Sequence, residues 1–238
     1  MDPLRGIPFL RLAADRLHPE AAFLLARILI CTNSYSEAVK YLEIAIRLNN
    51  EDALVTYGEM LCTGDHVRQD LSRGVALLQR AMKTVNDVKS LIIIGFRFYK
   101  IHTNSLLVDA RKCFMKGASL NNPAAIFNYG FMLEKGEGGE KDIKKALDMY
   151  IKAAELNSVP ALIHLGEMCE EGRYMDNPRY DKAVEFYTKA KILGSSDAAR
   201  AIERVEMKRR RSQAASSFRG IDERGLLIGL LLKDFLDL

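Results

Sequence analysis

The sequence predicts an all-α solenoid of stacked helix pairs, and two features carry that prediction. The first is a small residue, Ala or Ser, that recurs every 32 to 37 residues and opens one helix of each repeat. The second is a small–large–small pattern at offsets of zero, four and seven residues in a second helix. Residues at these offsets share one stripe of an α-helix. Each pair therefore has an apolar face that the next pair can cover.

The first helices share three marked positions. A small residue opens each helix, a bulky Leu, Tyr or Ile follows four residues later, and Ala or Gly comes directly after it. The last helix breaks this rule with Glu203. The opening residues are Ala21, Ala53, Ser90, Ala125, Ala161 and Ala198, and the later pairs are Leu25–Ala26, Tyr57–Gly58, Ile94–Gly95, Tyr129–Gly130 and Leu165–Gly166.

The second helices carry the small–large–small stripe. Two helices approach closely where one offers Ala or Gly and the other a bulky side chain, so we expect this stripe to pack on the first helix of its pair. The triplets are Ala38, Leu42, Ala45; Gly74, Leu78, Ala81; Ala110, Phe114, Gly117; Ala146, Tyr150, Ala153; and Ala183, Tyr187, Ala190.

Three of the connections inside the pairs begin with glycine. They read GDHVRQD at 64–70, GEGGEKD at 136–142 and GRYMDNP at 172–178. Glycine tolerates the positive φ at which many helices end, and an aspartate before a helix can accept hydrogen bonds from its first backbone N–H groups. We therefore expect the glycines to end the first helices, and Asp70 and Asp142 to cap the second helices.

This layout resembles the Sel1-like repeat, a relative of the tetratricopeptide repeat with a longer loop inside each repeat. The resemblance covers about residues 6–205 and is best in the second, fourth and fifth repeats; the first looks more like a plain tetratricopeptide repeat, and the third lacks the loop glycines. It implies a right-handed α/α superhelix of about five helix pairs. The matching residues are Gly58, Gly64, Val67, Asp70, Gly130, Gly136, Asp142, Ala146, Ala153, Gly166, Gly172 and Ala183.

Both ends of the chain depart from the repeat. We expect a capping half-repeat at 1–19, because Gly6, Leu10 and Ala13 reproduce the second-helix pattern; five repeats at 20–197; and a terminal first helix at 198–211. A linker at 212–224 would then lead to the apolar segment 225–238. That segment either packs back as a cap or docks on a membrane surface or in a partner's groove. Its apolar run of seven residues is shorter than the roughly 20 that span a bilayer.

Composition argues against several function classes. The formal charge is +4, and the window 204–211 accounts for all of it, so the main body lacks the broad basic patch that nucleic-acid binding requires. The four cysteines stand far apart without a CxxC pair, which argues against a zinc site and fits a reducing compartment. The N-terminus has no secretory signal pattern. We therefore expect a cytoplasmic protein that binds no nucleic acid.

No catalytic pattern is visible in the sequence. The four histidines fall at unrelated repeat positions, and GEGGEKD has neither the GK[ST] sequence nor the preceding strand of a phosphate-binding loop. We predict no catalytic residues, no metal, no cofactor and no small-molecule substrate.

The predicted binding surface is a groove. In the tetratricopeptide pattern, residues two, six and nine positions after the opening residue line the concave wall. Here these positions include Phe23, Arg27, Ile30 and Val55 at one end, and two acidic residues, Glu167 and Glu170, at the other. In the third and fourth repeats they form an aromatic patch that either anchors an apolar segment of a partner protein or packs against the neighbouring repeat. The patch residues are Ile92, Phe96, Tyr99, Phe127 and Phe131.

A basic run, Lys208, Arg209, Arg210 and Arg211, precedes Ser212 near the end of the repeats. Three interpretations are open. The run is a solvated helix end, where cations are favoured by the helix dipole; or it contacts an acidic surface or import receptor; or it directs a basophilic kinase to Ser212.

The resemblance implies a non-catalytic scaffold or adaptor that binds partner proteins in assembling or regulating complexes. Two alternatives remain. One is a membrane-proximal regulatory subunit docked through 225–238. The other is a hydrolase of the kind proposed for some bacterial Sel1-like proteins, which the lack of a paired nucleophile and base disfavours. The sequence does not determine the partner or the oligomeric state.

Overall fold

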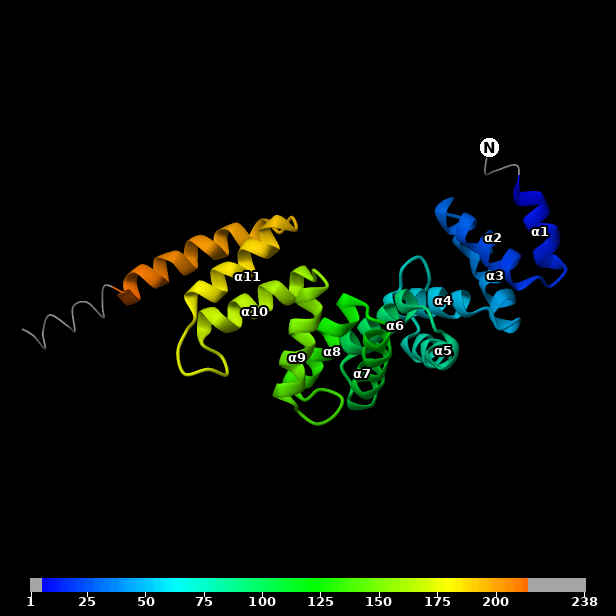
Figure 1. The fold of residues 1–238 in the computed structure, drawn as a ribbon. Helices are drawn as coiled ribbons and strands as arrows, with labels where there is room; N and C mark the ends of the chain where they lie inside the picture. The colour runs from blue at the N-terminus through cyan, green and yellow to red at the C-terminus, as the bar shows by residue number, and fades with distance from the viewer. Residues whose placement is uncertain (1–5, 214–238) are drawn as a thin grey trace, which may run out of the picture. The chain divides into compact units, whose positions relative to one another are not determined.

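The structure, a computed structural model, describes residues 6–213 and is helical throughout, with no strand in that range (Figure 1). Eleven helices are followed by one over residues 196–213. The bounds are α1 (Ile7–Asp15), α2 (Pro19–Cys31), α3 (Tyr35–Arg47), α4 (Glu51–Thr63), α5 (Leu71–Thr84), α6 (Val88–Ile101), α7 (Asn104–Ser119), α8 (Pro123–Lys135), α9 (Ile143–Glu155), α10 (Val159–Glu171) and α11 (Tyr180–Ile192).

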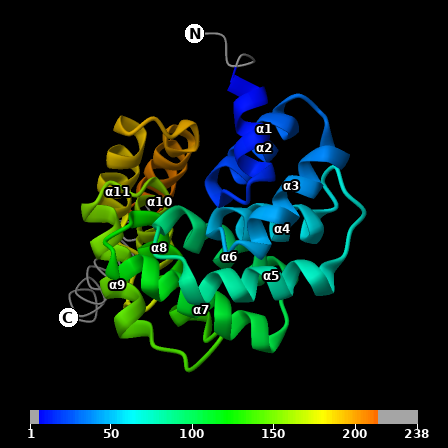
Figure 2. The same cartoon turned by 90° about the vertical axis from the view of Figure 1, so that its right-hand side faces the viewer.

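The chain divides into two compact units, Met1–Met149 and Tyr150–Leu238. In the N-terminal unit, α2 pairs with α3, α4 with α5 and α6 with α7, and the first helices α4 and α6 also contact each other (Figure 2). In the C-terminal unit, α10 pairs with α11. These pairs confirm the predicted all-α repeat architecture.

The residues that mark the repeat form the core. All six opening residues of the first helices are buried, as are the bulky residue four positions later and the small residue five positions later in the first five repeats. Every residue of the five second-helix triplets is buried as well. The periodic residues are thus the ones removed from water, which is the main favourable contribution to folding.

Glycine allows the two helices of a pair to approach closely. A Cβ placed on Gly58 would lie 2.9 Å from Leu78, one on Gly95 would lie 2.9 Å from Phe114, and one on Gly166 would lie 2.6 Å from Tyr187. In each case the close neighbour is the bulky residue of the second helix in the same repeat. The predicted small-against-large packing is therefore present in three repeats.

The loop predictions also hold. Gly64, Gly136 and Gly172 follow α4, α8 and α10 in the left-handed conformation, with φ of 79°, 74° and 70°. Asp70 accepts a hydrogen bond from the backbone N–H of Arg73 at 3.0 Å, and Asp142 accepts one from that of Lys145 at 2.9 Å. Both aspartates cap the following helices.

The third repeat differs because its connection is short. His102 alone takes the left-handed conformation after α6, with φ of 60°, and Thr103 caps α7 by accepting a hydrogen bond from the backbone N–H of Leu106. Two residues therefore replace the glycine loop, which explains why this repeat fits the pattern poorly.

A helix lies at each end of the described range. Residues 7–15 form a helix in the predicted N-terminal half-repeat, and the terminal helix runs over 196–213, two residues beyond the predicted 198–211 at each side. Ser212 and Gln213, expected in the linker, are helical. The rest of the linker and the segment 225–238 lie outside the described residues. Among the helices of 6–213, none combines the length and apolar character needed to cross a bilayer.

Candidate functional site

The five patch residues lie on one side of two first helices in the N-terminal unit. Ile92, Phe96 and Tyr99 are four and three residues apart on α6, and Phe127 and Phe131 are four apart on α8. Phe96 is 40% exposed and the other four are half-buried. None belongs to the fully buried core, whereas their neighbours Ile94, Phe98 and Ile126 do.

Aromatic contacts join the patch across the two helices. The rings of Tyr99 and Phe131 meet edge to face with centroids 6.5 Å apart. Phe96 packs one side against the buried Phe114 ring of α7 at 5.3 Å. The Lys135 ammonium lies 5.6 Å from the Phe131 ring centroid, within cation–π range. The patch thus joins α6 and α8 through Tyr99 and Phe131, rests on the core through Phe96, and keeps part of its area exposed.

Polar groups border the patch. Arg97 of α6 forms a two-pronged ion pair with Glu59 of α4, which raises the pKa of the guanidinium. Burial, followed by the nearby Glu137 carboxylate, raises the pKa of the Tyr99 hydroxyl. The ion pair links two neighbouring first helices, so it helps to fix the surface that they present.

A hollow of about 440 Å³ opens on the first helices α2, α4 and α6. Phe23, Arg27, Ile30 and Val55, which all occupy predicted groove positions, line it together with residues of α6. Charges of both signs stand at its edge, including Asp52 and Lys89. The repeat pattern predicts these residues on the groove wall but does not predict a hollow among them, because its shape depends on how three helices pack.

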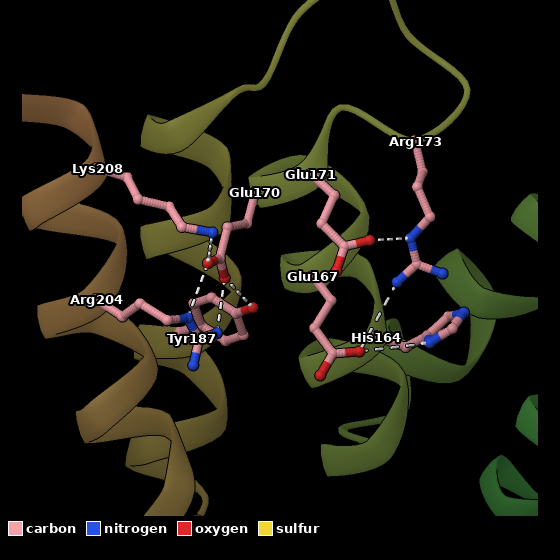
Figure 3. A network of polar contacts seen from close by, with 8 residues as sticks. All are labelled: His164, Glu167, Glu170, Glu171, Arg173, Tyr187, Arg204 and Lys208. Carbon is pink, nitrogen blue, oxygen red and sulfur yellow. Dashed lines mark hydrogen bonds and ion pairs between the residues drawn. The ribbon is translucent and has the colours of Figure 1, made fainter. Parts of the chain in front are cut away.

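In the C-terminal unit, polar side chains converge on one buried carboxylate, that of Glu170 on α10 (Figure 3). Arg204 donates from Nε to Oε1 at 2.8 Å and from Nη2 to Oε2 at 2.7 Å. Lys208 donates to Oε1 at 2.8 Å, and the Tyr187 hydroxyl donates to Oε2 at 2.9 Å. The carboxylate thus joins α10, α11 and the helix 196–213.

The charges of this cluster stabilise one another. Arg204 first, then Lys208 and Tyr187, lower the pKa of Glu170 to about 2 against the opposing effect of burial. The same carboxylate raises the pKa of Arg204, and burial followed by Glu170 raises that of Tyr187. Sequence reasoning noticed Glu170 only as a groove position. The signal it missed was the Arg204–Lys208 pair, four residues apart in the next first helix.

The basic run is used in part within the chain. Lys208 bonds to Glu170, and Arg209 lies 3.1 Å from the Asp181 carboxylate of α11. Arg210 and Arg211 are exposed. Ser212 is exposed on the same helix and borders a hollow of about 460 Å³ with Arg179, Lys182 and Arg209. The interpretation as a wholly solvated helix end is thus incomplete, and the phosphorylation of Ser212 stays a prediction.

Histidines and cysteines form no shared site in the described residues. The rings of Tyr35 and His66 stack with centroids 3.9 Å apart, and His164 meets Tyr150 edge to face at 4.6 Å. Between residues 6 and 213, no group of three or more His, Cys, Asp or Glu is placed to hold a metal ion. All four cysteines are free, and burial raises the pKa of the Cys113 thiol to about 12.

The Sel1 repeat family model matches residues 19–50, 52–82, 123–158 and 159–195, which together make up more than half of the chain. This chain belongs to the Sel1 repeat family. The unmatched stretch between the second and third matches coincides with the repeat whose loop is replaced by His102 and Thr103. Sel1 repeat proteins are typically scaffolds for protein–protein interaction, and are generally not catalysts. No curated protein matches the sequence.

Solved structures share the fold at low sequence identity. A protective antigen of uropathogenic Escherichia coli with an SLR fold has a TM-score of 0.71 and 20% identity, and the match covers 85% of this chain but only 44% of the antigen. A Sel1 repeat protein from Oxalobacter formigenes has a TM-score of 0.60 and 20% identity, with 82% and 88% covered. The human IFIT1 dimer with PPP-AAAA has a TM-score of 0.55 and 18% identity, with 86% and 50% covered. These likenesses show the fold alone.

Proposed function

We propose that this Sel1 repeat protein is a non-catalytic scaffold that binds an apolar segment of a partner protein on the first helices of its N-terminal unit. The observation that carries the proposal is the aromatic patch of α6 and α8, whose five members keep exposed area beside fully buried neighbours. Single exposed apolar side chains are ordinary on a folded protein, whereas apolar side chains gathered on one surface are characteristic of a binding site.

The chemistry of the patch favours a protein partner. Aromatic side chains bury large areas with little loss of conformational freedom, and they are enriched among the residues that dominate protein interfaces. The Tyr99–Phe131 contact and the Phe96–Phe114 contact hold three of these rings in place before binding. Such preorganisation lowers the entropy cost of association.

The hollow on α2, α4 and α6 extends the proposed surface. It combines apolar side chains with charges of both signs, which fits an extended peptide better than a polyanion. Because α6 contributes to both the hollow and the patch, one peptide can follow the first helices from one to the other. The four free cysteines agree with a reducing, cytoplasmic setting for this interaction.

Selection from a displayed library of random peptides tests the proposal. The unaltered chain is expected to enrich peptides with apolar and aromatic residues, and the double variant Phe96→Ser, Phe131→Ser is expected to lose that enrichment while melting near the unaltered chain. Phe9→Ser is the matched control, because Phe9 is exposed on α1, away from α6 and α8. Equal enrichment by the double variant would refute a binding role, and gross destabilisation would assign the patch to the core.

A further inference from the structure

The terminal helix 196–213 has an uncovered face in the described part of the chain. In the five complete repeats, the residues four, five and eight positions after the opening residue are all buried. In the terminal helix the same positions hold Ile202, Glu203 and Glu206, of which Glu203 is exposed and the other two are half-buried. These positions face the second helix of the pair, as the contact of Gly166 with Tyr187 shows. Within residues 6–213 that second helix is missing.

The uncovered face is hollowed and partly apolar. A cavity of about 370 Å³ is lined by Ile202, Met207 and three charged residues of the same helix. Met207 is 55% exposed, although Val205, two residues earlier on the same helix, is fully buried. The other side of the helix is fixed in place by Arg204 and Lys208 on the Glu170 carboxylate. The helix is therefore held with Met207 and part of Ile202 exposed on this face, while Ala198, Ala201 and Val205 are buried.

We infer that the segment 225–238 of this same chain covers this face in place of the missing second helix. The segment carries an unbroken apolar stretch of Leu and Ile around Gly229, and it needs a surface to bury it. Charges of both signs flank that stretch, Glu223 and Arg224 before it and Lys233 and Asp234 after it, and the helix face likewise carries Glu203, Glu206 and Arg210. Terminal repeats of solenoids require such a cover, with a polar outer side.

The intervening residues are long enough for this arrangement. Eleven residues, 214–224, separate the helix from the segment and can extend to roughly 36 Å. The helix 196–213 is about 27 Å long, so the segment can turn back and reach any part of it. In the complete repeats the equivalent connections also return the chain antiparallel, as between α10 and α11.

Methyl NMR of the full chain, with Met207 as the reporter, tests the inference. Met115 is the reference, because the two methionines have similar exposed fractions within residues 6–213, at 55% and 49%. If the segment covers the face, a soluble gadolinium chelate should broaden the Met207 methyl signal several-fold less than that of Met115. The variant Leu227→Asp, Leu231→Asp should abolish this protection, and Ser216→Asp, Ser217→Asp, which adds the same charge in the linker, should retain it.

Four results would overturn the inference. Equal broadening of Met207 and Met115 in the unaltered chain means that the face is open. Protection that survives Leu227→Asp, Leu231→Asp means that another part of the chain covers it. Protection that grows with protein concentration assigns the cover to a second copy. Protection that appears only with vesicles of phosphatidylcholine and phosphatidylserine assigns the segment to a membrane. An unshifted Met115 signal checks that each variant is folded.

Discussion

Replacing Glu170 by glutamine should release the helix 196–213 from the C-terminal unit. The carboxylate accepts hydrogen bonds from Arg204, Lys208 and Tyr187, and glutamine keeps the shape while removing the charge. A carboxyl whose pKa falls from 4.5 to about 2 gains about 3.5 kcal/mol when charged, since each pKa unit is worth about 1.4 kcal/mol. That figure is an upper limit.

The expected loss is smaller because the partners are not buried. The side chains of Arg204 and Lys208 are 49% and 47% exposed, so after the substitution both cations return partly to water. Only the Tyr187 hydroxyl is fully buried, and glutamine still offers it a polar group at the same position. We therefore expect a loss of about 2 kcal/mol, below the 3 to 5 kcal/mol typical of broken buried pairs.

Hydrogen–deuterium exchange measures this loss locally. Repeat proteins unfold in parts, so the amides of 196–213 should exchange about 30-fold faster at pH 7 in Glu170→Gln, while those of α10 change less. Glu171→Gln is the matched control, because Glu171 is the next residue on α10, its side chain is 55% exposed, and it pairs with Arg173 at 2.8 Å rather than with the helix 196–213. Unchanged protection of 196–213 in Glu170→Gln, or an equal effect of the control, would refute the reasoning.

The Glu170 carboxylate also makes the stability of the helix 196–213 depend on pH. Its pKa is lowered in the folded state, so the stabilisation is complete above about pH 4.5 and is lost as the pH falls toward 2. After correction for intrinsic exchange rates, protection of 196–213 should therefore be constant from pH 7 to 5 and should fall below that range. In Glu170→Gln this fall should be absent. A fall of equal size in the variant would show that another group is responsible.

Three further predictions concern the N-terminal unit and the helix pairs. Phe96→Ala should lower the free energy of unfolding by less than about 1.5 kcal/mol, mainly through the lost ring contact, whereas Phe98→Ala, on the buried side of the same helix, should lower it by about 3 to 5 kcal/mol. Equal losses in urea unfolding would place the patch in the core. Gly166→Ala should cost about 1 to 3 kcal/mol, because its Cβ would lie 2.6 Å from the ring that covers it; a neutral result would show that the pair can separate freely. Iodoacetamide at pH 8 should modify Cys31, which is exposed, and should spare Cys113, whose pKa is raised to about 12 by burial, until the protein is unfolded. Mass spectrometry measures the modification of each cysteine over time. Similar rates for Cys31 and Cys113 in the folded protein would contradict this prediction.

Much of the fold follows from the sequence because helix packing is local and periodic. A bulky residue such as Tyr187 can approach α10 closely where Gly166 omits a side chain, and the same contact is present in two other repeats, at Gly58 and Gly95. Gly64 and Asp70 likewise mark the end of α4 and the start of α5, because positive φ and capping are properties of single residues. The third repeat departs from the sequence pattern because His102, and not a glycine, takes the left-handed conformation after α6.

The exposure of the patch is intermediate between the two predicted outcomes. The repeat frame places Phe96 and Phe131 on the groove wall, but it does not fix how closely the neighbouring first helices approach. The structure gives Phe96 one side against Phe114 and leaves the other side exposed. Half-exposure of this kind depends on the distance between helices, which no spacing in the sequence encodes.

The sequence by itself determined the helix pairs, their buried stripes and the Sel1 repeat pattern, because all three depend on contacts between residues close in the chain. Only the tertiary structure decided that Glu170 meets Arg204 and Lys208, residues 34 and 38 positions away, and that a hollow opens on α2, α4 and α6. The physical reason is that these features depend on contacts between residues far apart in the chain. A buried charge needs partners from whichever helix lies nearest in space, and the shape of a surface depends on how several helices pack together.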